Sequence, residues 1–195
     1  GFHSHSSIHL MIEIERRAFA DRSKYLGDPD FYDIPQDQLL DSVYLINRLN
    51  NINLSHATPS DSIHPGELLL EESDETTHFS IVDEDGNAVS ITTTLNGSYG
   101  SGVIVDGAGF LLNNEMDDFS IKPGYPNLYG LIGGEANAIA PEKRMLSSMT
   151  PSIVEKNDSL NLVVGSPGGS AIITAVYQTL LNVIEFEMSI DLSLI

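Results

Sequence analysis

Two threonines and a histidine, Thr76-Thr77-His78, stand where an acidic stretch of the chain gives way to a β-rich stretch. A threonine hydroxyl is a weak nucleophile at its ordinary pKa and needs an adjacent base. The terminal amine of the same residue can be that base, but this amine exists only if the chain is cut directly before it. A threonine at this border is therefore a candidate N-terminal nucleophile.

A second hydroxyl comes from the run "TTTLN", residues 92–96. The residues Asp-Glu-Asp-Gly-Asn at 83–87 separate this run from the first threonines and predict a hairpin turn. If the turn is centred on Asp85, Thr94 pairs with Thr76 on one face of the hairpin, whereas a two-residue loop would shift the pairing by one residue. In both registers two threonines are neighbours at the open end of the hairpin.

The stretch "GSPGGS", residues 165–170, follows a strand-like run and precedes a helical pattern. It lacks the lysine of a phosphate-binding loop. Its simplest interpretation is a tight turn from strand to helix. The N–H groups of Gly168 and Gly169 at a helix start are also suited to hold a developing oxyanion, and both interpretations stay open.

A dense polar cluster follows another apolar run and contains Asn113, Asn114, Glu115, Asp117 and Asp118. One interpretation is a solvated loop. The other is a recognition site for the ammonium group of an amino acid, because grouped carboxylates would pair with that cation.

Two other groups of polar residues have spacings found at metal sites. Asp83, Asp85 and Asn87 resemble the start of a calcium loop, but no glutamate follows at the place where such a loop needs one. A hairpin turn is the favoured interpretation. His3 and His5 lie near the N-terminus, where a metal role is disfavoured. We therefore predict no metal site.

Two helices are predicted in the first quarter of the chain, over residues 7–26 and 36–49, from the spacing of apolar residues. The apolar face of the first is expected to consist of Ile8, Met11, Ile14, Ala18 and Phe19. Residues 50–75 are rich in Asn, Ser, Pro, Asp and Glu, which predicts a surface linker that tolerates a chain break.

Short strands and loops are predicted for the remainder. Residues 102–114 suggest two short strands bent at Asp106-Gly107, and residues 122–151 read as long loops. The segment 159–186 predicts a strand, a glycine turn and a helix whose apolar face consists of Ile172, Ile173, Val176, Leu180 and Ile184.

The composition describes an acidic globular chain. Its 195 residues are 41% apolar, enough for a core, and the formal net charge is −19. Such a field repels phosphate backbones, so we expect no nucleic-acid partner. The chain has no cysteine and no apolar run of transmembrane length. It begins at Gly1 without a methionine, and we expect it to be an internal part of a longer precursor.

Five motifs together are specific for one family: "TTHFSIVDEDGNAVSIT", "GFLLNNEMDDFSIKPG", "NLYGLIGGEANAIAPEKR", "LSSMTPSIV" and "GSPGGS". With them the chain resembles the bacterial gamma-glutamyltranspeptidases over about residues 8–188. That family has the N-terminal nucleophile hydrolase fold, so the resemblance implies an α+β chain that forms part of a four-layer αββα sandwich. It also implies self-cleavage between Glu75 and Thr76. Residues 1–75 would then end a large subunit and residues 76–195 begin a small catalytic subunit.

The resemblance implies roles for ten residues. Thr76 matches the family's nucleophile, Thr94 the hydroxyl that assists it, and Gly168 and Gly169 the oxyanion-hole glycines. The remaining matches bind the glutamyl group or cover the pocket, and they are Asn96, Glu115, Asp118, Ser147, Ser148 and the lid residue Tyr129.

The implied reaction is acyl transfer from glutathione or another gamma-glutamyl compound to water, an amino acid or a peptide, without a metal or organic cofactor. The resemblance further implies a heterodimer of large and small subunits in the periplasm or outside the cell. It places the arginine that clamps the substrate carboxylate before Gly1. Two positions depart from the family pattern, Met145 in place of proline and Ala171 in place of arginine.

Two other functions stay open. A related acylase acting on beta-lactam side chains would share Thr76 and the two glycines but would change the carboxylate-binding residues. An inactive, non-enzymatic fragment would be uncut and poorly folded.

Overall fold

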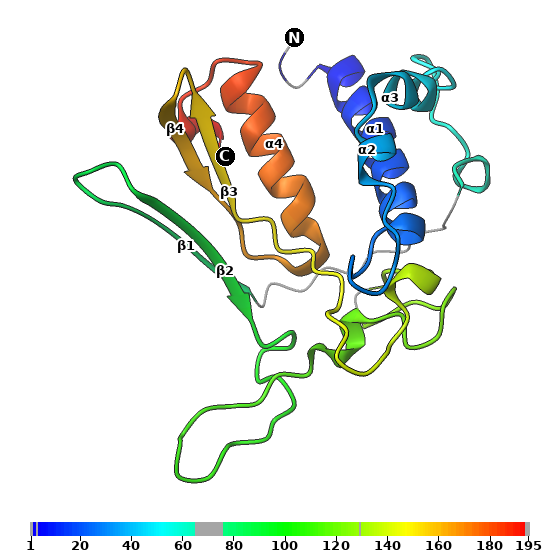
Figure 1. The fold of residues 1–195 in the computed structure, drawn as a ribbon. Helices are drawn as coiled ribbons and strands as arrows, with labels where there is room; N and C mark the ends of the chain where they lie inside the picture. Colours follow the sequence, from blue (N-terminus) through cyan, green and yellow to red (C-terminus); the bar gives the residue numbers. More distant parts are fainter. Residues whose placement is uncertain (1, 3, 65–75, 129, 194–195) are drawn as a thin grey trace. The chain divides into compact units, whose positions relative to one another are not determined.

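A computed structural model describes residues 2, 4–64, 76–128 and 130–193. The chain divides into two compact units, each built from two separate segments. The first unit consists of Gly1–Leu70 and Met116–Leu146, and the second of Glu71–Glu115 and Ser147–Ile195. The described chain contains helices and antiparallel strand pairs, which agrees with the α+β class predicted from the sequence (Figure 1).

The first unit begins with helix α1, His5–Tyr25, which confirms the first predicted helix. The second predicted helix is divided into α2, Gln36–Leu39, and α3, Ser42–Leu49. Asp41 explains the division, because its carboxylate accepts a hydrogen bond from the backbone N–H of Tyr44 and starts a new helix. Residues 50–64 contain only a short 3-10 helix, and the rest of the predicted linker, residues 65–75, lies outside the described residues.

The predicted apolar face of α1 is wrong. The buried positions of this helix are Glu13, Arg17 and Ala20, whereas Ile8 is 38% exposed and Ala18 is exposed. The buried face contacts the irregular segment around Asn51 and Thr58. Backbone and side-chain groups of this segment form hydrogen bonds with the polar side chains of the helix. The spacing of apolar residues in a helix cannot predict polar contacts with a distant segment of the chain.

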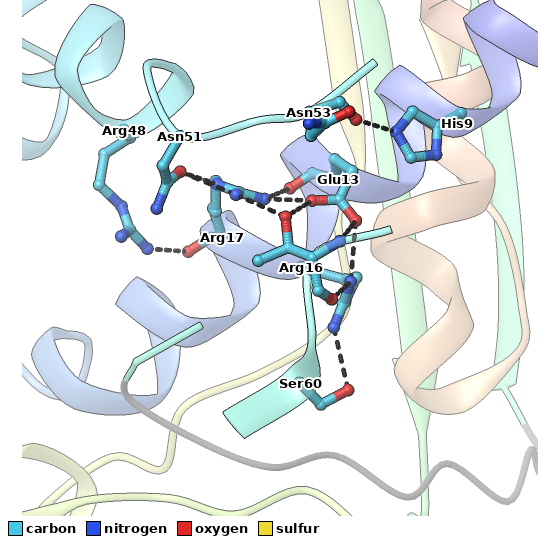
Figure 2. A network of polar contacts seen from close by, with 9 residues as sticks. His9, Glu13, Arg16, Arg17, Arg48, Asn51, Asn53 and Ser60 are labelled. Carbon is cyan, nitrogen blue, oxygen red and sulfur yellow. Dashed lines mark hydrogen bonds and ion pairs between the residues drawn. The ribbon is translucent and has the colours of Figure 1, made fainter. Parts of the chain in front are cut away.

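Glu13 is the centre of a buried polar network (Figure 2). Its carboxylate accepts bonds from Arg16 and Arg17, both at 2.8 Å, and from the Thr58 hydroxyl at 2.5 Å and the Thr58 N–H at 3.1 Å. Arg17 also donates to Asn51, which joins α1 to the same loop. Burial opposes ionisation of Glu13, but the bonds from Thr58 and Arg17 outweigh it and lower the pKa to about 2.

The Glu13 network should make the stability of this unit sensitive to acid. Because the pKa of Glu13 is about 2 in the folded chain against an ordinary 4.5, its contribution is complete above about pH 4.5 and is lost as the pH falls towards 2. Glu13→Gln removes one partner of a buried ion pair, which typically costs about 3–5 kcal/mol. Thermal unfolding followed by circular dichroism should show a lower Tm for Glu13→Gln and a smaller acid-induced decrease than in the wild type.

Glu84→Gln is the matched control, because Glu84 is an exposed acid in a turn. Its Tm and its acid response should match those of the wild type. An acid response of Glu13→Gln as steep as that of the wild type would contradict the role of Glu13.

The loop segment of the first unit, residues 116–146, is tied to α1 and to the chain after it. The N–H of Gly134 donates to the Ser23 carbonyl at 2.9 Å, and the Ser23 hydroxyl donates to the carbonyl of Ile132. Arg144 forms ion pairs with Asp28, and these bonds hold the pKa of that carboxyl well below its usual range. The predicted long loops are confirmed here, apart from short 3-10 turns.

The second unit begins with a hairpin of β1, Thr76–Val82, and β2, Ala88–Thr94. The register pairs Thr76 with Thr94, as the turn centred on Asp85 predicts. The Asp83 carboxylate closes the turn by accepting bonds from the backbone N–H groups of Asp85 and Asn87. The carboxylate that resembles a calcium ligand is thus used by the hairpin turn itself.

A second hairpin joins β3, Ser152–Lys156, to β4, Ser159–Val164. We did not predict β3. The pair Asn157-Asp158 between the strands, with φ of 54° and 58°, is typical of the tight turn that connects such strands. The two predicted strands within residues 102–114 are reduced to one bridge, Ile104 with Leu111.

The predicted sequence of strand, glycine turn and helix is confirmed. After β4 a 3-10 turn, Gly169–Ala171, leads into helix α4, Ile172–Ile184. Figure 1 shows α4 beside the β3–β4 hairpin. The core of this unit is Val164, Ile172 and Val176 with Met149, Leu162 and Leu180 around them. A short helix, α5, Ile190–Ser193, contacts α4.

No helix of the described residues is both long enough and apolar enough to cross a bilayer.

Candidate active site

The open end of the β1–β2 hairpin places two threonines opposite each other. Thr76 is the first residue of β1, and its partner in the ladder is Thr94, the last residue of β2. Opposite residues of an antiparallel pair point to the same face, with Cβ atoms about 4.5–5.5 Å apart. The two hydroxyl groups therefore share one face. Thr77 points to the opposite face, because side chains alternate along a strand.

Asn96 follows the second threonine, Thr94, by two residues and fixes it. Its backbone N–H donates to the Thr94 hydroxyl at 2.9 Å, and its side-chain amide donates to the Asn114 carbonyl at 3.3 Å. Asn96 is 5% exposed and has a φ of 73°, a conformation that asparagine tolerates better than most residues. Position 96 therefore requires a short polar side chain on a residue that can adopt the left-handed backbone conformation.

The predicted polar cluster is an ordered loop at its first residues. The Asn114 side chain accepts a bond from the Gly97 N–H at 2.9 Å, and the Asn114 N–H donates to the Leu95 carbonyl at 3.1 Å. Glu115 comes next and is half-buried, and burial raises the pKa of its carboxyl. A carboxylate that has lost part of its hydration gains more from pairing with an ammonium ion.

The glycine turn has a backbone that other residues rarely adopt. Gly168 has a φ of 128° and Gly169 a φ of 53°. Ser170 is 4% exposed, so the turn lies against the core rather than projecting from it. The first N–H groups of a helix have no carbonyl partner within that helix, and here they belong to this turn. Such groups carry partial positive charge and suit an oxyanion.

The hairpin and the chain before the glycine turn are in direct contact. The Ser90 hydroxyl donates to the Val164 carbonyl at 3.2 Å, and the ring of His78 packs against Gly165. Strands β1 and β2 both contact β4. The threonine pair and the glycine turn, distant in sequence, are therefore parts of one framework within the second unit.

Ser147 and Ser148 lie in the segment that leads into β3. Ser147 accepts a bond from the Met149 N–H at 3.0 Å, and Met149 packs against the core formed by Val164 and Ile172. These two core residues lie just before and just after the glycine turn. The serine pair is thus fixed to the part of the core that supports the turn.

Of the other two predicted site residues, Asp118 is not part of this unit and Tyr129 is not described. Asp118 belongs to the first unit, where its carbonyl accepts a bond from Asn137 at 2.7 Å. Arg22 of α1 is a neighbouring cation: burial lowers the pKa of its guanidinium to about 10, and the charge of Asp118 opposes that shift. Tyr129 lies outside the described residues.

Sequence reasoning missed two side chains at these elements. It assigned no role to His78, although strand alternation puts this residue on the same face as Thr76. It did not place Arg22 beside Asp118, and the helical spacing of α1 contains no signal for that contact.

Comparison with known proteins supports one family. The gamma-glutamyltranspeptidase family model matches residues 1–194. The glutathione hydrolase proenzyme of Pseudomonas aeruginosa is 55% identical over 184 residues, which cover 94% of this chain and 32% of that protein. The glutathione hydrolase proenzyme of Escherichia coli is 51% identical over 190 residues, covering 97% and 33%. The chain therefore spans about a third of the length of these curated relatives.

Two solved structures are similar to this chain, one of a gamma-glutamyltranspeptidase and one of an acylase. A gamma-glutamyltranspeptidase of Pseudomonas nitroreducens, in complex with L-DON, is 61% identical with a TM-score of 0.58, covering 60% of this chain and 61% of that one. A cephalosporin acylase of Bacillus halodurans is 26% identical with a TM-score of 0.75, covering 96% of this chain and 31% of that one.

Proposed function

The chain belongs to the gamma-glutamyltranspeptidase family, and on that basis we propose that it carries the nucleophile of a self-cleaving gamma-glutamyl transferase and hydrolase. The register that puts Thr94 opposite Thr76 at the start of β1 is the observation that carries the proposal. It supplies a candidate nucleophile and a second hydroxyl at the position where the family motif begins.

The first proposed step creates the active residue. The Thr76 hydroxyl attacks the carbonyl carbon of Glu75 and forms an ester as the C–N bond breaks, which frees the Thr76 amine. Water then hydrolyses the ester and releases Glu75 as a carboxylate. The freed amine is close enough to its own hydroxyl to act as the base in later turnovers.

The second proposed step is the reaction with substrate. The Thr76 hydroxyl attacks the γ-carbonyl of a gamma-glutamyl compound such as glutathione, and the amine takes the proton. The N–H groups of Gly168 and Gly169 hold the oxyanion, and Thr94 orients the attacking hydroxyl. The leaving amine takes a proton, and water or an acceptor amino acid or peptide resolves the glutamyl ester. Oxyanion donors of this kind lower a barrier by about 3–4 kcal/mol.

Substrate recognition is assigned to polar groups from several loops. Glu115 and Asp118 bind the α-ammonium group, supported by the partial burial of Glu115. Asn96, Ser147 and Ser148 hold the α-carboxylate by hydrogen bonds, and Tyr129 covers the pocket. The arginine that the family uses for the carboxylate is expected from the large subunit.

Residues 1–75 would form the end of the large subunit and residues 76–195 the beginning of the small one. The first compact unit contains segments from both sides of the proposed cut. Contacts between those segments include the Asp28–Arg144 ion pair at 2.5 Å and the bond from Gly134 to Ser23. These bonds do not depend on the peptide bond before Thr76, so the two products should stay together as a heterodimer.

The proposed fold is the four-layer αββα sandwich, with the β1–β2 and β3–β4 hairpins as parts of its sheets. The similarity to the gamma-glutamyltranspeptidase and the cephalosporin acylase structures supports it. We also propose a periplasmic or extracellular location, as the family resemblance implies.

A beta-lactam side-chain acylase is one alternative, and an acylase proenzyme of a Pseudomonas strain is 34% identical over 191 residues. Glutathione hydrolase proenzymes at 51–55% identity favour gamma-glutamyl substrates. An inactive fragment is the other alternative, and it predicts no cleavage before Thr76.

Steady-state assays of the complete gene product that contains this chain would test the proposal. Release of the amine from a gamma-glutamyl anilide should be measurable and should increase with an added acceptor dipeptide. Release from a beta-lactam side-chain amide but not from the anilide would favour the acylase.

The serine pair should determine substrate affinity. Each hydrogen bond lost to a charged group costs about 1.5–3 kcal/mol, so Ser147→Ala and Ser148→Ala should each raise KM roughly tenfold or more. The effect on kcat should be smaller, because the bonds exist before and during the reaction. Ser159→Ala, an exposed serine at the start of β4, is the matched control. Unchanged KM and kcat in the double variant would contradict the assignment.

A further inference from the structure

His78 lies on the polar face of the β1–β2 hairpin, and no proposed step uses its side chain. His78 follows Thr76 by two residues, so the two side chains share a face. Its Nδ1 is hydrogen-bonded to the Thr92 hydroxyl at 2.8 Å and its Nε2 to the Ser80 hydroxyl at 3.0 Å. Because both ring nitrogens are bonded, the imidazole is held in one orientation.

The held ring lies against Gly165, the first residue of the glycine turn. A Cβ atom on Gly165 would lie 2.2 Å from Cε1, 2.3 Å from Nδ1 and 2.8 Å from Nε2 of His78, and each distance is too short for a real Cβ atom. Gly165 is not among the glycines with positive φ. The imidazole, and not the backbone conformation, therefore requires a glycine here.

A second contact fixes the preceding residue. The Ser90 hydroxyl donates to the Val164 carbonyl at 3.2 Å, and Val164 is buried against Ile172 and Val176. The hairpin thus contacts two consecutive residues directly before the turn. Only two residues, Ser166 and Pro167, follow before the first oxyanion glycine, and proline restricts φ to about −65°. A displacement at Gly165 should therefore be passed on to the turn.

We propose that His78 is a positioning residue whose imidazole sets the spacing between the threonine pair and the N–H groups of Gly168 and Gly169. The inference rests on the proposed function, in which those groups hold the oxyanion. Such donors must lie about 3 Å from the oxyanion. A misplacement of about 1 Å can lower a rate about 100-fold.

A double-substitution cycle in the complete gene product tests this spacing. Gly165→Ala should lower kcat for gamma-glutamyl anilide hydrolysis about 100-fold and change KM less than about threefold. His78→Ala alone loses the ring that sets the spacing and should lower kcat, but by less than Gly165→Ala does, because it also removes the ring that a Cβ atom on residue 165 would meet. The double variant should therefore have a kcat at least about tenfold higher than Gly165→Ala alone. A double variant as slow as Gly165→Ala, or slower, would overturn the proposal.

Two conservative variants separate positioning from a general loss of structure. The amide of His78→Asn can reach the Thr92 hydroxyl in place of Nδ1, and that of His78→Gln can reach the Ser80 hydroxyl in place of Nε2. At least one should have a higher kcat than His78→Ala, with an unchanged Tm relative to it. If neither does, the bonded ring is not what sets the spacing. His56→Ala, an exposed histidine of the first unit, should behave as the wild type.

The wild-type protein separates this inference from the proposed function. If the wild type does not turn over gamma-glutamyl compounds, the proposed substrate is wrong. The same four variants are then compared by their rate of cleavage before Thr76. If the wild type is active and the two substitutions are simply additive, only the spacing role of His78 is wrong.

Discussion

Thr76→Ala is expected to leave the complete gene product uncut before residue 76 and without gamma-glutamyl transfer activity. The variant lacks the oxygen that attacks the Glu75 carbonyl and later forms the glutamyl ester. Removing the nucleophile of a serine hydrolase lowers kcat on the order of 10⁶-fold, so activity should fall to background. Denaturing gels and an anilide assay would measure the two effects.

Two neighbouring variants make this result specific. Thr76→Ser keeps the oxygen and loses only a methyl group, so cleavage should continue, more slowly, with residual activity. Thr77→Ala should be cut and active, because the Thr77 side chain points to the opposite face of β1. Cleavage of Thr76→Ala together with an uncut Thr77→Ala would move the nucleophile by one residue. Equal cleavage of all three would mean that a separate protease cuts the chain.

Gly168→Ala is expected to lower kcat about 10²–10³-fold, the effect of losing one oxyanion donor. The φ of Gly168 is 128°, where a side chain is strained, although a Cβ atom there would meet nothing within 4 Å. The backbone must therefore rotate to accept alanine, and the N–H groups of the turn rotate with it. KM should change little, because the oxyanion exists only during the reaction. Stopped assays over a range of substrate concentrations would separate the two constants.

Gly86→Ala is the control for backbone strain. Gly86 has a φ of 84° in the β1–β2 turn and also has nothing within 4 Å of a Cβ position. Gly168→Ala and Gly86→Ala both place a side chain at a positive φ, but only Gly168→Ala changes the candidate site. Gly86→Ala should lower Tm and leave kcat unchanged. A kcat for Gly168→Ala equal to that of Gly86→Ala would contradict the oxyanion assignment.

The sequence predicts best those features that depend on residues close together in the chain. The pairing of Thr76 with Thr94 follows from a five-residue turn that Asp83 closes with its own carboxylate, together with the alternation of two strands. The turn from strand to helix follows from glycines at positions that require positive φ. Local chemistry determines both, so no knowledge of the tertiary fold was needed.

The features that sequence did not predict depend on distant contacts. The face of α1 centred on Glu13 is buried because a loop some forty residues later supplies Thr58 and Asn51. The approach of His78 to Gly165 also has no local signal, since glycine in such a turn is expected for backbone reasons alone. The missed strand β3 is different, because the Asn157-Asp158 pair was a usable turn signal.

Mass spectrometry of peptides from the expressed wild-type protein, stopped during turnover of a gamma-glutamyl compound, tests the central claim most directly. The proposal predicts a peptide that begins at Thr76 with a free amine, and a fraction of the same peptide with a glutamyl group on the Thr76 hydroxyl. An intact Glu75–Thr76 bond in active protein, or a glutamyl group attached to another residue, would contradict the assignment of Thr76 as the N-terminal nucleophile.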